Sequence, residues 1–327
     1  MKKVLKIIGI ILLVSVVLVT VGLFAIVKLG EYKSAHYYEN ATTGGDIEKK
    51  YSELGSYDVS YIEFDAITAA FGKYAIWYPS KLESVDNKYP VVIWANGTGS
   101  TSSTYTAFLT HLSSWGFITV GNDDQDTRTG TSLEETIQFL IAENENKDSI
   151  FYHKIDLDHI GIGGHSQGGP AVFNMVTNQE HGYIVKTVYA VSATSSYHTA
   201  IFEDGWEYDI SKVNVPVFLT AGTGSFDAGT ATSKDQVSDE KNGIMQGICP
   251  LWSLQENYDL LPETIDKVIA RKTNVDHGDS YLQFDGYMTA WFMWQLQGDQ
   301  EAAKAFTGKS AELLNNTLYQ DQRINIK

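Results

Sequence analysis

The stretch from His159 to Gly169, HIGIGGHSQGG, decides the fold. A short strand, His159–Gly163, precedes the serine in it, and a stretch that can form a helix follows. Between the two, Gly164-x-Ser166-x-Gly168 has the pattern of a tight turn that places a serine between a strand and a helix. Glycines are needed there because strand and helix approach too closely for side chains. The pattern therefore indicates that Ser166 is the nucleophile of a serine hydrolase.

A serine hydroxyl needs a base to accept its proton and a carboxylate to orient that base. Where a serine occupies this turn, the acid and then the histidine follow it along the chain. His277 lies just past the last predicted strand, where the base belongs, whereas His181 and His198 come too early. Asp227 follows the seventh predicted strand and is the predicted acid. Three acidic residues farther along the same loop remain alternatives: Asp235, Asp239 and Glu240.

The negative charge that forms during acyl transfer needs two backbone N–H donors, which form the oxyanion hole. One donor belongs to the residue after the nucleophile, Gln167. The other belongs to the loop after the third strand, where Thr98 is the predicted donor and Gly97 the near alternative. We expect backbone groups, and not the side chains of these residues, to act as the donors.

Short β-branched runs alternate with helical patterns from Tyr57 onward, which is typical of a largely parallel sheet. The sequence predicts an α/β fold with a mostly parallel eight-stranded sheet flanked by helices, and one catalytic domain over residues 57–327. The predicted strands are Val59–Phe64, Tyr74–Tyr78, Val91–Ala95, Ile118–Asn122, His159–Gly163, Val185–Val191, Val217–Ala221 and Lys267–Arg271. The predicted helices are Thr104–Trp115, Leu133–Glu145, Gln167–Val176 and Gly286–Leu296.

Composition narrows the function classes. The formal net charge of −16 argues against a nucleic-acid partner, because phosphate binding needs a basic surface. The single cysteine, Cys249, excludes an intrachain disulfide. Neither a zinc pattern nor a phosphate-binding glycine-rich loop occurs, and Asp123–Asp126 lacks the glycine and terminal glutamate of a calcium loop. We therefore expect no metal and no cofactor.

The N-terminal region has the character of a membrane anchor. An apolar run, Ile7–Val27, would span about 31 Å as a helix, which matches the hydrocarbon core of a bilayer. No small-x-small cleavage site follows, so an uncleaved signal anchor over residues 1–29 is favoured over a cleaved signal peptide. Residues 30–56 are predicted to be a stalk. More lysines precede the run than follow it, which predicts a single-pass protein of the cell membrane with its catalytic domain outside: Lys2, Lys3 and Lys6 against Lys28 and Lys33.

The sequence resembles the cutinase-like and polyester-hydrolase branch of the α/β-hydrolases, close to the dienelactone hydrolases, from about Tyr74 to Leu296. The resemblance implies a cofactor-free esterase that acts through an acyl-enzyme, with its oxyanion hole at Thr98 and Gln167. The residues that carry it are Val91–Gly99, Ser114–Val120, Gly164–Gly169 and the loop around His277.

Two departures from that branch bear on the substrate. Polyester-cleaving members have an aromatic residue where this chain has Thr98, and a tryptophan after the sixth strand, where this chain continues Ala193–Ser196. Their C-terminal disulfide is missing as well. The resemblance therefore implies small or aliphatic esters as substrates. Amide or peptide cleavage, acyl transfer on the same triad, and a non-catalytic surface protein are the alternatives.

Overall fold

The computed structural model describes residues 36–66, 71–82, 87–201, 206–236 and 247–327, with a few single residues between Ser15 and Tyr32. The chain divides into two compact units, Met1–Asn40 and Ala41–Lys327. In the first unit, the 3-10 helix η1 spans Tyr37–Asn40. Most of the predicted anchor, Ile7–Val27, lies outside the described residues. Within the described part of the chain, no helix combines the length and apolar character needed to cross a membrane.

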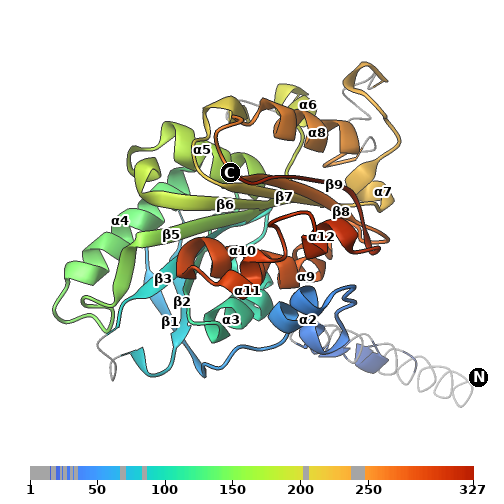
Figure 1. Ribbon diagram of the computed structural model, residues 1–327. Coiled ribbons are helices and arrows are strands. Elements are labelled where there is room, and N and C mark those ends of the chain that lie inside the picture. Colours follow the sequence, from blue (N-terminus) through green and yellow to red (C-terminus); the bar gives the residue numbers. More distant parts are fainter. Residues whose placement is uncertain are drawn as a thin grey trace, which may run out of the picture. The chain divides into compact units, whose positions relative to one another are not determined.

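A nine-stranded sheet forms the centre of the second unit as far as it is described, in the order β1-β2-β4-β3-β5-β6-β7-β8-β9 (Figure 1). The strands from β4 across to β8 run parallel, whereas β1 and β2 at one edge and β9 at the other are antiparallel to their neighbours. The strands are β1 (Val59–Asp65), β2 (Lys73–Pro79), β3 (Tyr89–Ala95), β4 (Ile118–Asn122), β5 (Ile155–His165), β6 (Val185–Val191), β7 (Val217–Gly222), β8 (Lys267–Lys272) and β9 (Tyr319–Asn325).

The predicted α/β class and the mostly parallel sheet are confirmed, but the predicted number of eight strands is wrong. The additional strand, β9, pairs with β8 at the edge of the sheet. Its sequence, YQDQRIN, is mostly polar, and only Tyr319 is fully buried. A polar edge strand that is only partly buried along its length lacks the alternation of apolar and polar residues by which strands are recognised.

Helices cover both faces of the sheet, as Figure 1 shows. The helices α3 and α10 pack on one face, and α4, α5 and α8 pack on the other. The α-helices are α2 (Asp46–Ser52), α3 (Thr106–Ser114), α4 (Thr131–Glu145), α5 (Gly168–Asn178), α6 (Ser196–Ile201), α7 (Ser225–Ala228), α8 (Leu251–Leu260), α9 (Ser280–Gln283), α10 (Asp285–Gln297), α11 (Gln300–Ala303) and α12 (Glu312–Asn315). The 3-10 helices of this unit are η3 (Ser102–Tyr105), η4 (Glu180–Ile184), η5 (Ile210–Lys212) and η6 (Lys234–Gln236).

The compact unit begins earlier than the predicted boundary at residue 57. Residues from Ala41 belong to it, and α2 packs against α10, so the end of the predicted stalk is part of the folded domain. Tyr51 is completely buried, and Glu48 forms a buried ion pair of 2.8 Å with Lys272 at the end of β8. These contacts join residues more than two hundred positions apart. The polar composition of residues 30–56 alone therefore could not predict them.

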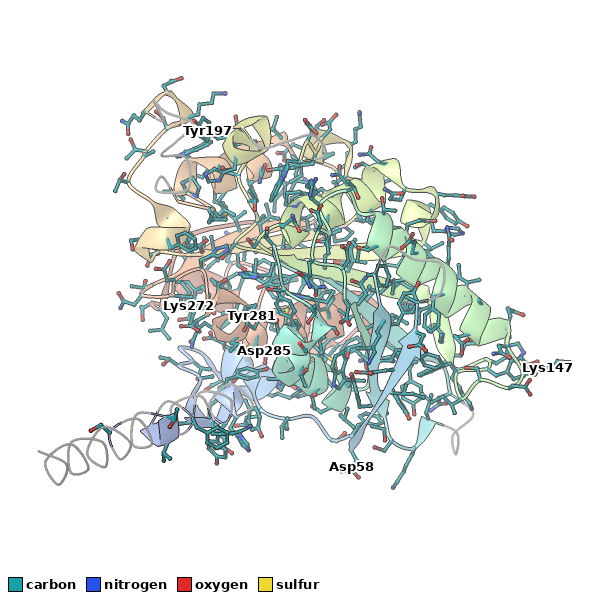
Figure 2. All side chains as sticks on the ribbon, turned by 180° about the vertical axis from the view of Figure 1, so that it is seen from behind. Asp58, Lys147, Tyr197, Lys272, Tyr281 and Asp285 are labelled. Atoms are coloured by element: carbon teal, nitrogen blue, oxygen red, sulfur yellow. The ribbon has the colours of Figure 1, made fainter. Side chains whose placement is uncertain are left out.

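A second buried ion pair joins α3 to α10. The Nδ1 atom of His111 lies 2.9 Å from a carboxylate oxygen of Asp285, and its Nε2 atom donates a hydrogen bond of 2.7 Å to the carbonyl of Glu53. In Figure 2, Asp285 lies beside α3. Burial alone would lower the pKa of His111, but the Asp285 carboxylate and the hydrogen bonds raise it above its ordinary value of 6.5. The imidazolium form is therefore the one that the folded protein stabilises.

Replacing His111 by glutamine is expected to destabilise the protein by about 3–5 kcal/mol near pH 6, because Asp285 is left buried without a cation. The raised pKa makes this contribution fully present below about pH 6.5, and it is lost as the pH rises through the folded-state pKa. Urea unfolding should therefore show a smaller loss near pH 9. His159→Gln, in an exposed pair with Asp156, is the control and should change stability by less than about 1 kcal/mol. Equal losses for His111→Gln at the two pH values would contradict this account.

Candidate active site

Ser166 occupies a strained turn between β5 and α5. Its φ is +58°, in the left-handed region that residues other than glycine seldom adopt. Two glycines make this turn possible. A Cβ on Gly164 would lie 2.2 Å from the carbonyl oxygen of Gly168, and one on Gly168 would lie 2.3 Å from that of Ala95. The Gly-x-Ser-x-Gly pattern thus forms the predicted strand–turn–helix, and the serine hydroxyl points into a pocket.

His277 and Asp227 continue a series of hydrogen bonds that starts at Ser166. The Oγ atom of Ser166 lies 3.0 Å from Nε2 of His277, and Nδ1 of the same ring lies 3.1 Å from Oδ1 of Asp227. The histidine lies on the loop after β8, and the aspartate lies in α7 after β7. The three predicted triad residues, which span 111 positions, are therefore within hydrogen-bonding distance of one another.

The other acidic candidates do not take part in this series as far as the structure describes them. Asp235 lies exposed in η6, whereas Asp239 and Glu240 lie outside the described residues. The two other histidines that follow Ser166 have different partners. His181 pairs with Glu134, and His198 contacts Ser195.

The Asp227 carboxylate is completely buried and accepts further hydrogen bonds. Its Oδ2 atom accepts from the Ser192 hydroxyl at 2.7 Å and from the N–H of Gly222 at 2.5 Å. Ser192 itself has a φ of +49° at the end of β6. One carboxylate oxygen is thus held by the scaffold while the other remains available to His277, which fixes the orientation of both side chains.

A second carboxylate, Asp276, ties the acid-bearing turn to the loop that carries the base. Its Oδ1 atom accepts hydrogen bonds from three backbone N–H groups, those of Asp227 at 2.8 Å, His277 at 2.9 Å and Phe226 at 3.1 Å. Partial burial alone would raise the pKa of Asp276, but these three donors hold it below its ordinary range. Asp276 therefore fixes the loop of His277 relative to the turn of Asp227, although it contacts neither the hydroxyl of Ser166 nor the ring of His277.

Replacing Asp276 by alanine is expected to lower kcat by about 10–100-fold, because a small misplacement of the acid and base loops is costly to catalysis. Asp276→Asn, which keeps an acceptor but loses the charge, should fall between that variant and the wild type. Asp279→Ala, which removes an exposed carboxylate from the same loop, is the control and should stay near the wild type. Steady-state kinetics on a short-chain ester tests this, and equal kcat values for Asp276→Ala and Asp279→Ala would refute it.

The backbone N–H groups predicted for the oxyanion hole lie next to Ser166. The N–H of Gly97 already donates a hydrogen bond of 2.8 Å to the hydroxyl of Tyr105. Among the described residues, neither the N–H of Thr98 nor that of Gln167 has an acceptor. The Gln167 side chain is buried, accepting from Thr127 N and donating to Asp126. The geometry therefore favours Thr98 over Gly97 and leaves the backbone of Gln167 as the second donor.

The pocket at Ser166 has a volume of about 500 Å³ and is mainly apolar. Two aromatic walls, Trp206 and Phe226, were not expected from the sequence, which lacks aromatic residues at the two positions where the polyester-cleaving branch has them, Thr98 and Ala193–Ser196. Phe226 stands edge-on to the His277 ring at 5.3 Å between centroids. Both come from loops whose position depends on the fold of the whole chain, so no local pattern marks them. The lining residues are Gly97, Thr98, Ser100, His165, Ser166, Thr194, Trp206, Phe226, Ile248 and His277.

One group of side chains in the described part of the chain has the arrangement of metal ligands. It consists of Glu134, Glu180 and His181. The His181 ring is already hydrogen-bonded to the Glu134 carboxylate, and none of the three residues lines the pocket that contains Ser166. This group is therefore separate from the candidate active site.

Comparison with known protein families supports the same fold. A model of the family described as Chlorophyllase matches residues 53–191, which is less than half of the chain. The match includes the turn at Ser166 and the loop at Thr98, but it ends before Asp227 and His277. The matched residues are therefore similar to a family of the α/β-hydrolase type. No curated protein matches the sequence.

Three polar residues that surround the candidate triad were not selected from the sequence: Ser192, Tyr105 and Asp276. Asp276 is adjacent to His277 and so had a positional signal, but its partners lie about fifty residues away. Ser192 follows β6 directly, at the same carboxyl end of the parallel strands as the turn at Ser166, and that position in the topology could have pointed to it. Tyr105 carries no comparable signal.

Proposed function

We propose that this protein is a serine esterase that cleaves carboxylic esters through an acyl-enzyme intermediate. The observation that carries the proposal is the hydrogen-bonded series from Ser166 through His277 to Asp227, which opens into an apolar pocket. The similarity to an α/β-hydrolase family of ester hydrolases adds support.

In the first half of the reaction, Oγ of Ser166 attacks the ester carbonyl while Nε2 of His277 accepts the hydroxyl proton. The Asp227 carboxylate stabilises the resulting imidazolium through Nδ1–H. The carbonyl oxygen becomes an oxyanion, which the N–H groups of Thr98 and Gln167 stabilise. When the intermediate collapses, the bond to the leaving oxygen breaks, and the imidazolium gives its proton to the leaving alcohol.

In the second half, a water molecule replaces the alcohol. His277 removes a proton from the water as it attacks the acyl carbon, and the same two N–H groups stabilise the second oxyanion. Collapse releases the carboxylic acid, and the proton returns from His277 to Ser166. No cofactor is required for either half.

The pocket favours uncharged esters of small to medium size. Its volume of about 500 Å³ is within the range of sites for small molecules. Its walls are apolar at Trp206, Phe226 and Ile248, and among the residues that the structure describes no carboxylate or cationic side chain other than the histidines lines it. A charged acyl group would lose its hydration there without gaining a partner. We therefore infer a small or aliphatic ester as substrate, with room for one flat or branched group against the aromatic walls.

Substrate profiling of the full-length protein in detergent tests the proposal. Nitrophenyl esters of graded chain length are compared with the matching anilides, and a fluorophosphonate probe reports the nucleophile. We expect turnover of short and medium esters, little turnover of anilides and labelling of Ser166. Anilide cleavage as fast as ester cleavage would instead identify an amidase. Labelling without hydrolysis of either class would indicate acyl transfer, and absence of labelling would indicate a non-catalytic protein.

We further propose that the hydrolase is held at the outer face of the cell membrane by the segment Ile7–Val27. Its length, its apolar character and the excess of lysines before it support the proposal. Protease added to intact cells should remove the domain, and alkaline extraction should leave the protein in the membrane fraction. A mature N-terminus after Val27 would show instead that the segment is cleaved.

A further inference from the structure

A buried chain of hydrogen bonds connects the loop of the oxyanion hole to the loop of the base. The N–H of Gly97 donates to the Tyr105 hydroxyl at 2.8 Å, and that hydroxyl lies 3.2 Å from Nδ1 of His165. The Nε2 atom of His165 lies 3.0 Å from the carbonyl oxygen of His277. Tyr105 is 1% exposed and His165, which lines the pocket, is 7% exposed, so these hydrogen bonds are largely shielded from solvent.

The direction of each hydrogen bond follows from the chemistry of its groups. Gly97 can only donate, so the Tyr105 oxygen accepts there and its own proton points to Nδ1 of His165. Nε2 of His165 must then carry the hydrogen that is donated to the His277 carbonyl. Burial raises the pKa of Tyr105 to about 12 and lowers that of His165 to about 3, so the phenol stays protonated and the imidazole stays neutral. Every group in the chain thus has the protonation state that its neighbours require.

The chain passes directly beside the nucleophile. His165 precedes Ser166 in the sequence, and its ring lies 4.7 Å from the ring of His277 between centroids. A Cβ on Gly97 would lie 3.2 Å from the Tyr105 hydroxyl and 3.3 Å from the Cβ of Ser166. The backbone that carries the Thr98 N–H is therefore packed against the nucleophile and fixed in place by Tyr105, while His165 fixes the backbone of His277.

We propose that Tyr105 and His165 are positioning residues, which set the oxyanion donor of Thr98 and the base His277 at their working distances from Ser166. The inference rests on the proposed esterase function. The N–H of Gly97 already donates to the hydroxyl of Tyr105 and cannot serve the oxyanion, so Thr98 is left as the donor of that loop. Neither residue contacts the substrate carbonyl in this account.

The ring of Tyr105 has a separate role in packing, which the experiment must exclude. It packs against Trp94 and Tyr281, with ring centroids 5.6 and 5.0 Å away. Tyr281, which Figure 2 places beside α3, also packs against His165, at 5.3 Å. Its hydroxyl makes no hydrogen bond within the described part of the chain. Tyr281→Phe is therefore a matched control, because it removes a hydroxyl from the same aromatic cluster without breaking the hydrogen bonds from Gly97 to His277.

The test compares full-length wild type, Tyr105→Phe, His165→Phe, the double variant and Tyr281→Phe. We expect Tyr105→Phe and His165→Phe each to lower kcat by about 10–100-fold, and Tyr105→Phe to change KM little, because Tyr105 does not line the pocket. Affinity for a boronic acid that adds to Ser166 should fall by a similar factor, since it mimics the oxyanion intermediate. The double variant should lose no more than about the larger single loss, because the two residues act as a unit.

Three outcomes would overturn the inference. Tyr105→Phe could match Tyr281→Phe in kcat and boronate affinity and differ only in its melting temperature, which would reduce Tyr105 to a packing residue. The losses of the single variants could multiply in the double variant, which would show that the two residues act separately. A wild type inert towards esters and the fluorophosphonate probe would refute the proposed function along with this inference, whereas the first two outcomes leave the esterase function intact.

Discussion

The Ser166→Ala protein is expected to fold normally and to lose about 10⁶-fold in kcat, the scale seen when a nucleophilic serine is removed from a triad. The hydroxyl is the atom that forms the acyl bond, and no neighbouring group replaces it. Its side-chain hydrogen bond is made to His277 alone among the described residues, so its loss leaves little unsatisfied. Alanine fits the same space, and its backbone bears the same strain at a φ of +58° as serine does.

Hydrolysis of a short ester and labelling by a fluorophosphonate measure this effect independently. Ser195→Ala is the control, since it removes another buried hydroxyl that follows β6 and contacts His198. That variant should keep near-normal kcat and full labelling. If Ser166→Ala were labelled as strongly as the wild type, the nucleophile would have to be another residue, and the role of the turn at Ser166 would be structural.

How much of this site the sequence predicts depends on the range of the interactions involved. The turn at Ser166 is local: a strand, two close-contact glycines and a helix lie within a few residues, so the pattern alone is informative. The parallel sheet follows from the alternation of strands and helices in the same way. His277 could be chosen because chain order places the base after the last parallel strand.

Residues whose role depends on distant partners could not be found in that way. Tyr105 joins Gly97 to His165, sixty residues away, and Asp276 reaches back about fifty residues to the turn of Asp227. Apart from the place of Asp276 beside His277, nothing in the sequence alone distinguishes either residue from other polar residues of the predicted loops and helices. The aromatic walls and the polar edge strand β9 were missed for the same reason, because tertiary packing and not a periodic pattern places them.

Asp227→Asn is expected to lower kcat by up to about 10⁴-fold, the loss expected when an uncharged amide replaces the triad acid. The substitution keeps the volume of a completely buried side chain, so packing should be little changed. An amide nitrogen facing Nδ1 of His277 would favour the tautomer that presents a hydrogen, not a lone pair, to Ser166. It would also leave the imidazolium without its counter-charge.

The acid is the triad member for which competing residues exist, so its test compares several positions under one set of conditions. Asp235→Asn removes an exposed carboxylate from η6 and should remain near wild type. Asp239→Asn and Glu240→Gln are included because the sequence leaves them as alternatives. A collapse of kcat for one of these, with Asp227→Asn near wild type, would move the acid to that residue. The hydrogen bonds from Ser192 and Gly222 argue for Asp227, since they hold one oxygen and orient the other toward His277.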